Sequence, residues 1–390
     1  MNRRSRSATR LFVATLGCLT LVGCSAELAF SDVDTEQRTF TQSFPDLPGQ
    51  VLRLANLAGE VELIAGEGEE VVVEAEVHAR GRNGAETRRL LDEMTWEEGV
   101  DAKDRPEWAL TYPVDRYKRF HFNGKGWSSV NRVRYRGERV SISSRARSGS
   151  PTVFVNLRIH YPGAGGLAVT NVVGDIRGGD LAGVLSLDTG SGAVALGDFS
   201  GELSVDTGSG DVRLGVVRGE TLVDTGSGDV RVRELIGNGR LDTGSGGIAV
   251  AKVAMGRLEA DTGSGDILIE NGSVGTLKAD TGSGGIRILS VDVVSLEADT
   301  GSGDVVLDSS LEGAERVNVD TGSGDVRIRT AEAAAFDIEL ESGSGELVVR
   351  YDDAELRRAD GEVVGARRGH GGPRITVDTG SGDCVIGPAA

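Results

Sequence analysis

The chain has 390 residues, three cysteines and a formal net charge of −18. This acidic balance excludes nucleic acid as a general partner, because the phosphate backbone would be repelled. With 58 glycines and only 4% aromatic residues, the composition excludes a helical bundle and favours a β protein rich in turns.

Residues 1–23 predict a lipoprotein signal peptide. Four arginines precede the apolar run LFVATLGCLTLV, which is too short to cross a bilayer as a helix. The junction Leu21-Val22-Gly23-Cys24 resembles the lipobox of bacterial lipoproteins, in which the cysteine is acylated, for example with palmitate. The resemblance implies a membrane anchor at Cys24 and a place in the cell envelope. Because Ser25 follows, it implies the outer membrane if the host has two membranes. The alternative is an ordinary secretory cleavage beside a chance cysteine.

Removal of this leader would leave an acidic protein with one free thiol. Cys18 would be lost and Cys24 lipidated, so that only Cys384 remains and no intrachain disulfide can form. The net charge of residues 24–390 becomes −22 once the four arginines have left. Residues 24–45 are expected to form a tether between the lipid and the folded part.

Residues 46–163 predict a β-rich cap region with one helix. The segments VVVEAEVHAR (71–80) and PTVFVNLRIHYP (151–162) have the character of strands, and GAETRRLLDEMTWEEG (84–99) that of a helix of about three turns. Such a region would cover the open edge of the first repeat, which stacked repeats need for solubility.

A basic strip lies inside this cap region. Between Arg116 and Arg147 ten basic residues are opposed only by Glu138, and aromatic residues alternate with them. Aromatic rings beside cations suit an anionic glycan or a phosphate-bearing envelope polymer. The favoured alternative is a solvated hairpin whose aromatics cover the end of the repeats. The candidate binding patch consists of Arg116, Tyr117, Lys118, Arg119, Phe122, Lys125, Trp127, Arg132, Arg134 and Arg136.

The second half of the chain repeats the motif Asp-Thr-Gly-Ser-Gly. Intact copies begin at Asp188, Asp206, Asp224, Asp242, Asp261, Asp280, Asp299, Asp320 and Asp378. A variant begins at Glu341, and weaker echoes lie at Asn171 and Asn56. Most copies are 18 to 21 residues apart, but the last begins 37 residues after the variant.

The residues around each motif alternate between apolar and polar. In the copy at Asp206, Leu203 and Val205 precede the motif, and Val212 and Leu214 follow it. This period predicts two short strands per repeat, each with one buried face. The fold class is therefore all-β: a parallel single-chain β-solenoid of about eleven coils over residues 164–390. Residues 350–373 interrupt the register as an excursion or cap, and Cys384 falls on a core position.

The motif itself is interpreted as the turn of a structural unit. Glycines on both sides of a serine would supply positive φ for a sharp arc. The repeat aspartates would form a column along one side, each accepting amides of its own arc. Arginines on the following strand, such as Arg213 and Arg231, would offset the repulsion within the column.

Other chemistries fit the motif less well. An aspartic protease needs two Asp-Thr-Gly loops that share a proton, not nine copies in a column. A nucleotide loop needs a following helix, whereas strand-like residues follow here. Calcium is a less favoured ligand, because each coil has one glycine turn and several copies lack the second carboxylate. The four histidines show no metal-ligand spacing. No catalytic residue, metal or cofactor is assigned.

Two stretches carry a resemblance to a known family. NVVGDI at Asn171–Ile176 and DTGSGDV at Asp206–Val212 resemble the bacterial putative-adhesin family, whose members have β-solenoid repeats of unknown function. The resemblance covers residues 50–387 and implies a non-enzymatic envelope lipoprotein that presents its solenoid to a surface polymer or envelope protein. The alternatives are an envelope-stress sensing component and a polysaccharide-acting enzyme on a β-helix.

Overall fold

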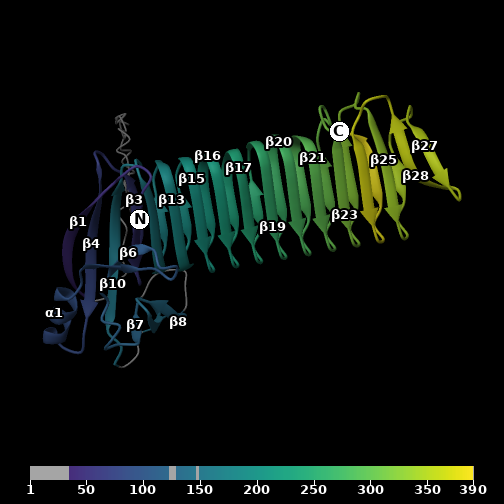
Figure 1. Ribbon diagram of the computed structural model, residues 1–390. Helices are drawn as coiled ribbons and strands as arrows, with labels where there is room; N and C mark the ends of the chain where they lie inside the picture. The colour runs from purple at the N-terminus through teal and green to yellow at the C-terminus, as the bar shows by residue number, and fades with distance from the viewer. Residues whose placement is uncertain (1–34, 123–128, 146–148, 390) are drawn as a thin grey trace, which may run out of the picture. The chain divides into compact units, whose positions relative to one another are not determined.

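The repeats fold into stacked rungs of parallel strands. The computed structural model describes residues 35–122, 129–145 and 149–389, and Figure 1 shows the rungs side by side. Strand β16 (Val212–Thr225) pairs in parallel and in register with β17 (Val230–Thr243), so that Val212 lies beside Val230 and Asp224 beside Asp242. The predicted parallel β-solenoid of about eleven coils is confirmed.

Each rung consists of two arms joined by the Gly-Ser-Gly arc. The apolar residues before and after the arc point inwards and are almost fully buried, as the alternation predicts. The other rung strands are β11 (Gly166–Val173), β12 (Ile176–Gly178), β13 (Leu181–Ser191), β14 (Val194–Leu196), β15 (Phe199–Thr207), β18 (Ile248–Val250), β19 (Val253–Thr262), β20 (Ile267–Thr281), β21 (Ile286–Thr300), β22 (Val305–Asp308), β23 (Arg316–Thr321) and β24 (Val326–Thr330).

The arc glycines allow close stacking and do not supply positive φ. A Cβ atom on Gly284 would lie 2.0 Å from the carbonyl oxygen of Gly265 in the preceding rung. Glycines with positive φ lie instead within the rung strands, for example Gly219 in β16 with a φ of 130°. The expectation of positive φ in the arc was therefore wrong, because the arc's constraint is the distance between stacked backbones.

The first rung lies inside the region that was predicted to be only a cap. Strand β2 (Val51–Asn56) pairs in parallel with β11, and β3 (Val61–Ala65) pairs in parallel with β12. The echo at Asn56 thus opens the solenoid, and a long insertion separates this rung from the next one. The boundary at residue 164 is corrected for that reason.

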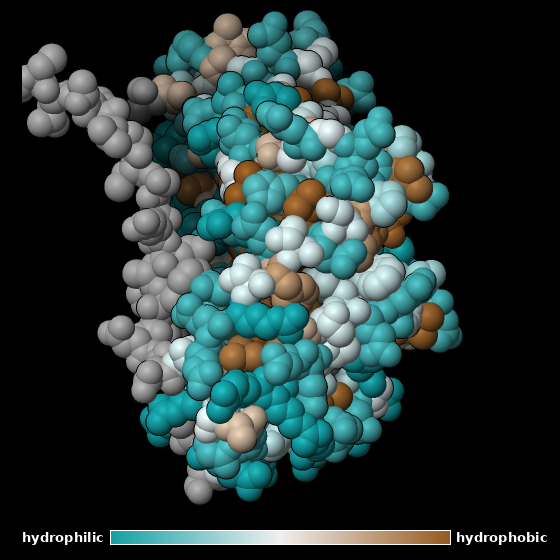
Figure 2. Space-filling view, turned by 90° about the vertical axis from the view of Figure 1, so that its left-hand side faces the viewer, coloured by the Kyte–Doolittle hydropathy of each residue, from teal (hydrophilic) through white to brown (hydrophobic). Residues whose placement is uncertain are grey.

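The insertion closes the outer edge of the first rung. On one arm, β2 is flanked by β6 (Pro106–Leu110), and on the other arm β3 is flanked by β10 (Thr152–Tyr161). Strand β10 continues into an antiparallel sheet with β4 (Glu70–Arg80) and β1 (Glu36–Pro45). Residues 36–45 are therefore a strand and not part of a tether. Figure 2 shows that mainly hydrophilic residues cover this end of the unit.

The single helix is shorter than predicted. Helix α1 (Gly84–Asp92) begins after Asn83, whose side chain accepts the amide of Glu86 at 2.9 Å. Glu86 in turn accepts the amide of Arg82, the residue before the N-cap, at 2.7 Å. The residues after the helix form β5 (Trp96–Val100), which pairs antiparallel with β6, and Trp96 is buried against Phe44 of β1.

The last rungs do not follow the order of the chain. Strands β29 (Arg374–Thr379) and β30 (Cys384–Pro388) lie between the rung of β23 and β24 and the rung of β25 (Phe336–Ser342) and β26 (Leu347–Val349). The hairpin β27 (Glu355–Ala359) and β28 (Glu362–Arg368) then covers the free edge of β25. The predicted excursion at 350–373 is this hairpin, and its return path explains the spacing of 37 residues.

Candidate functional site

The structure divides the predicted basic patch among several environments. Its described aromatic residues belong mainly to the core: Phe122 is buried, and Tyr117 is partly buried against the same cluster. They therefore offer no exposed platform for a ligand, because their faces are covered by protein. Lys125 and Trp127 lie outside the described residues, as does Cys24.

Acidic residues from α1 and β5 neutralise part of the patch. Arg116 pairs with Glu93, and Arg136 pairs with Glu97. Lys118 contacts Glu138 at 2.8 Å. The hydroxyl of Tyr117 donates to Glu86, and this bond, together with that from Arg82, lowers the pKa of Glu86 to about 2. These cations serve the packing of the cap region and are not free for a ligand.

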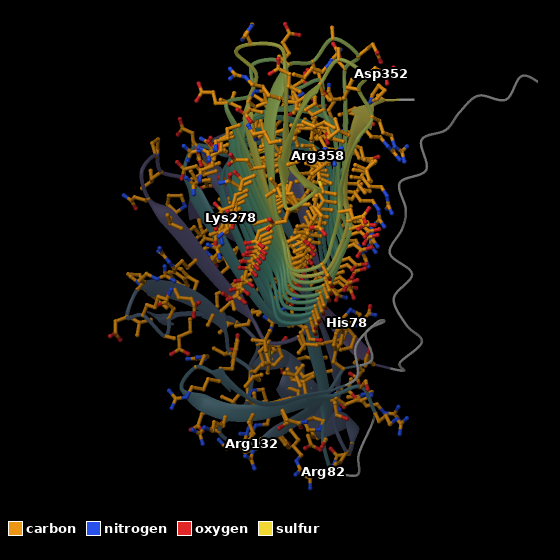
Figure 3. All side chains as sticks on the ribbon, turned by 90° about the vertical axis from the view of Figure 1, so that its right-hand side faces the viewer. His78, Arg82, Arg132, Lys278, Asp352 and Arg358 are labelled. Atoms are coloured by element: carbon orange, nitrogen blue, oxygen red, sulfur yellow. The ribbon has the colours of Figure 1, made fainter. Side chains whose placement is uncertain are left out.

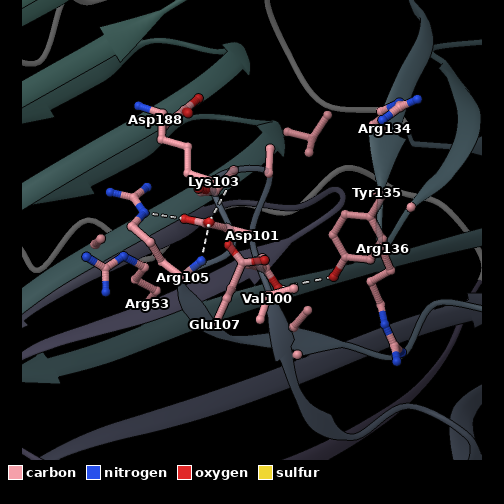
Figure 4. A pocket seen from close by; sticks show the side chains of 18 of the residues that line it. Arg53, Val100, Asp101, Lys103, Arg105, Glu107, Arg134, Tyr135, Arg136 and Asp188 are labelled. Carbon is pink, nitrogen blue, oxygen red and sulfur yellow. Dashed lines mark hydrogen bonds and ion pairs between the residues drawn. The ribbon is translucent and has the colours of Figure 1, made fainter.

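Arg134 and Arg136 reach a cavity of about 780 Å³ beside the first rungs. The β5–β6 hairpin supplies one wall, and the turn between β8 (Ser129–Tyr135) and β9 (Glu138–Ser143) supplies another. The outward faces of β2, β11 and β13 form the floor. Figure 4 shows that charged side chains of both signs line this space. Its charged lining consists of Arg53, Glu97, Asp101, Lys103, Asp104, Arg105, Glu107, Arg134, Arg136 and Asp188.

One carboxylate of the cavity is fully occupied by its own loop. Asp101 accepts the amides of Lys103 and Arg105 at 2.8 and 2.9 Å, and it pairs with the Arg105 guanidinium at 2.6 Å. Burial would raise the pKa of Asp101, but these hydrogen bonds lower it overall. The loop at residues 101–105 is thus fixed by its own contacts (Figure 4).

Two other carboxylates of the cavity are poorly compensated. Desolvation raises the pKa of Glu107, and the nearby charge of Asp101 raises it further. Desolvation also raises the pKa of Asp188, with a contribution from Asp206 in the next rung. Both groups would gain from a ligand that donates hydrogen bonds, because carboxylates partly withdrawn from water lack donors.

Arg53 leaves a buried donor of the cavity without a partner. Its Nη1 donates to the carbonyl of Val51 at 3.2 Å, but its Nε is buried and has no hydrogen-bond partner among the described residues. Buried polar groups in proteins are nearly always satisfied, so an unpaired donor at a cavity wall marks a place for a ligand or water. No sequence pattern singled out Arg53, because it lies far from the basic strip.

The aspartate column has a different chemistry from the one expected. The amide of Gly246 is accepted by the hydroxyl of Thr243 at 3.1 Å, and the same hydroxyl donates to the carbonyl of Gly228 at 2.9 Å. In the intact motifs from Asp206 onwards the threonine, and not the aspartate, therefore closes the arc and joins it to the preceding rung. Asp242 contacts Arg240 at 2.9 Å on the outer surface.

The aspartates that directly follow the Gly-Ser-Gly arc form a second row, and this row connects neighbouring rungs. Oδ1 of Asp229 accepts the amide of Gly247 in the next rung at 2.8 Å, and Oδ2 contacts Arg231 at 2.6 Å. The amide of Gly247 is the main cause that lowers the pKa of Asp229. The first aspartates of the motifs form the first row. There, desolvation and the neighbours Asp242 and Asp206 raise the pKa of Asp224. Figure 3 shows these carboxylate oxygens as rows along the stack.

The described residues offer neither a cluster of metal ligands nor a helix that could span a membrane. In ranges 35–122, 129–145 and 149–389, no three His, Cys, Asp or Glu side chains are grouped in a way that could hold a metal ion. Within the same part of the chain, no helix has the length and apolar character needed to cross a bilayer.

Comparison with solved structures finds distant likenesses over most of the chain. A putative lipid binding protein from Parabacteroides distasonis is 11% identical, with a TM-score of 0.35 and coverage of 90% of this chain and 96% of that one. A putative adhesin from Bacteroides fragilis is 10% identical, with a TM-score of 0.28 and coverage of 90% and 97%. Another putative adhesin from Parabacteroides distasonis is 9% identical, with a TM-score of 0.30 and coverage of 91% and 98%. TM-scores this low carry no argument about function.

The family model gives the more specific result. No curated protein matches the chain. Residues 222–386 match the family model described as Toastrack DUF4097. This segment contains the intact motifs from Asp224 onwards and the rungs described above. Residues 222–386 are therefore similar to the Toastrack DUF4097 family, and the resemblance to a family of unknown function is confirmed.

Proposed function

We propose that this protein is a non-enzymatic lipoprotein of the cell envelope that binds a surface polymer or an envelope protein. The solenoid acts as a rigid spacer, and the ligand is held in the cavity between the β5–β6 hairpin and the first rungs. The single observation that carries this proposal is the unpaired Nε of Arg53 in the wall of that cavity.

The lining of the cavity suits a polar ligand with both donors and acceptors. Arg134 has no ion pair within the described part of the chain, whereas Glu107 and Asp188 need donors. Sugar hydroxyls and peptide amides can serve both needs at once, because each offers a donor next to an acceptor. Anchoring by a lipid on Cys24 would hold this surface at the membrane.

The binding test compares matched variants of one cavity. Wild-type protein, Arg53→Gln, Arg134→Gln and the control Arg88→Gln on the outer face of α1 are immobilised and exposed to a cell-envelope extract. We expect the two cavity variants to retain about tenfold less ligand, because each loses a hydrogen bond to a charged donor. Equal capture by all four proteins would refute binding in this cavity.

The anchor is tested separately in cells. Cys24→Ala should abolish labelling with a radioactive fatty acid and should release the protein from membranes. Cys384→Ala is the control, since Cys384 is buried in the last repeat and cannot carry a lipid. Continued labelling of Cys24→Ala would refute acylation at this residue.

One observation favours the polysaccharide-acting enzyme as a second candidate function. Glu107 has a raised pKa and Asp101 a lowered one in the same cavity, and such pairs divide the roles of acid and base in glycosidases. However, the oxygens of Asp101 are held by Lys103 and Arg105. The test is whether the wild-type protein releases reducing sugar ends from envelope polysaccharide. If it does, and if Glu107→Gln abolishes this release, the protein is an enzyme and not a binding protein.

A further inference from the structure

A second cavity of about 340 Å³ lies against the β8–β9 hairpin and shares no lining residue with the first. Strand β7 (Arg119–His121) pairs in parallel with β9 and supplies one wall. The lining consists of Arg119, Phe120, Asn131, Arg132, Ser141, Ser143, Arg145 and Ser150. This set contains three guanidinium groups, three hydroxyls and one amide, but no carboxylate.

The three arginines of this cavity lack acidic partners. Arg116, Lys118 and Arg136 of the same strip each pair with a carboxylate. Within the described ranges, Arg119, Arg132 and Arg145 make no ion pair with any residue. The only acid between Arg116 and Arg147 is Glu138, which contacts Lys118. Three uncompensated like charges around one hollow repel one another, and an anion would remove this cost.

The backbone of β8 is distorted where Arg132 enters the cavity. The register of β8 and β9 shifts between Val130 and Val133, so that β8 bulges. Arg132 has a φ of 59°, a left-handed conformation that is rare for a side chain of this size. Its amide donates to Oγ of Ser141 at 3.2 Å across the hairpin. Bulges often redirect a side chain towards a site, and strain of this kind concentrates where function needs it.

Two serines of the lining have different roles. Ser141 accepts from the amide of Arg132, so its own proton remains available to a ligand. Ser143 donates to the carbonyl of Arg145 and accepts its amide at 3.2 Å, and these bonds fix the turn that carries Arg145. Guanidinium groups bind tetrahedral oxyanions with two parallel hydrogen bonds, which lysines cannot provide.

We propose that the cavity of Arg119, Arg132 and Arg145 is a binding site for a phosphate group carried by a larger ligand. A volume of about 340 Å³ exceeds that of a bare ion and suits a phosphorylated sugar or glycerol unit. The phosphate can belong to an envelope polymer, to a lipid headgroup or to a free metabolite, since the recognised chemistry is the same. This site is separate from the cavity of Arg53, so either proposal can fail without the other.

Titration calorimetry on the full chain in neutral detergent tests the site. The soluble probes are inorganic phosphate and glycerol 1-phosphate. Vesicles of a neutral lipid with or without phosphatidic acid are tested after the detergent has been removed, because detergent would dissolve them. Wild type is compared with Arg119→Gln/Arg132→Gln/Arg145→Gln. The control Arg88→Gln/Arg218→Gln/Arg329→Gln makes the same change of net charge at arginines outside the cavity, on α1 and on the rungs. We expect the cavity variant to bind glycerol 1-phosphate about a hundredfold more weakly and the control to bind it as wild type does.

The bulge provides a variant that separates binding from folding. Arg132→Gly removes the charge but suits the left-handed backbone, so the melting temperature should stay the same or rise while phosphate binding falls. Arg132→Lys should retain part of the affinity. The proposal is overturned if wild type binds none of the probes, or if the control loses as much affinity as the cavity variant. Binding to phosphatidic acid vesicles alone would assign the site to lipid, and binding to the soluble phosphate esters would assign it to a polymer or metabolite.

Discussion

The backbone amide of Asp383 donates a hydrogen bond to Oδ1 of Asp325 at 3.1 Å, although 58 residues separate the two in sequence. The same contact joins neighbouring rungs elsewhere, for example from the amide of Asp229 to Asp211. Strand β30 therefore occupies a regular rung position between β24 and β26, although it follows β26 in the sequence.

The reactivity of the buried Cys384 thiol measures how often the rung of β29 and β30 opens. Burial raises the pKa of Cys384 to about 12, so a thiol reagent should not react with it in the folded protein at pH 8. Arg368 holds the covering hairpin through the carbonyls of Glu332 and Ala334, at 2.6 and 2.8 Å, and through Asp353. We expect Arg368→Ala to increase the labelling rate of Cys384 about tenfold, because the terminal rungs then open more often.

The control for that measurement lies on the same hairpin. Arg358 makes one hydrogen bond, to the carbonyl of Gly361 at 3.0 Å, so Arg358→Ala should leave the labelling rate unchanged. A Cys384 that reacts at once in the native wild type would contradict the position of β30 inside the stack.

Adjacent glycines of one arc should respond differently to a methyl group. In Gly284→Ala the new Cβ would lie 2.0 Å from the carbonyl oxygen of Gly265, so we expect a loss of about 3 kcal/mol in the free energy of unfolding. In Gly285→Ala the nearest atom is 3.4 Å away, and an aspartate occupies this position in other rungs, so the change should stay within about 0.5 kcal/mol. Urea denaturation curves would measure both, and equal losses would argue against backbone contact as the reason for glycine.

The buried threonine hydroxyl should matter more than its methyl group. Thr243→Val keeps the shape but leaves the amide of Gly246 and the carbonyl of Gly228 unpaired, at a cost of about 2 kcal/mol. Thr243→Ser retains the hydroxyl and should recover most of that loss. Denaturation midpoints of the two variants give the comparison, and a valine variant as stable as wild type would show that these bonds contribute nothing net.

The two aspartate rows should have opposite effects on stability. The raised pKa of Asp224 means that its charged form is disfavoured in the folded state. Asp224→Asn should therefore stabilise the protein by about 0.3 kcal/mol at pH 7, a small amount because solvent screens exposed charges. The gain in stability from Asp224→Asn is complete above the pKa that Asp224 has in the folded state. It vanishes below the pKa of the unfolded state, which is about 4.

Asp229 represents the second row in the same experiment. The pKa of Asp229 is lowered in the folded state. Its contribution to stability is therefore fully present above the pKa of the unfolded state and is lost as the pH falls through the pKa of the folded state. Asp229→Ala should destabilise by about 1 kcal/mol at pH 7, because the amide of Gly247 and the guanidinium of Arg231 lose their acceptor. Thermal unfolding between pH 2 and 7 would test both signs, and effects of the same sign would refute the separation of the rows.

The sequence predicted the rungs well because their signal is local. Apolar alternation around each motif places Val212 and Leu214 in the core without knowledge of their neighbours. The first rung was not assigned because Asn56 is separated from Asn171 by the whole cap region, and only pairing in space joins them. The order of the last two rungs was hidden for a related reason, since each copy can stack on any other in the same register.

The candidate site was predicted less well because its partners come from distant segments. The strip from Arg116 to Arg147 gave no indication that Glu93 and Glu97 would neutralise two of its cations. It also could not separate Arg134, which lines one cavity, from Arg132, which lines the other. Their division depends on the bulge in β8, and no residue pattern in that strand specifies where a bulge occurs.

The intercalated C-terminal rung has a consequence for how the chain is completed during synthesis. A solenoid whose rungs follow the chain can grow as it leaves the ribosome, each new repeat stacking on a finished one. Here β25 and β26 must wait for β29 and β30, which follow them in the chain, before their place on the stack exists. The far end of the array therefore matures only after β29 and β30 have taken their place, and a chain truncated before Arg374 would leave β25 and β26 without the rung on which they stack.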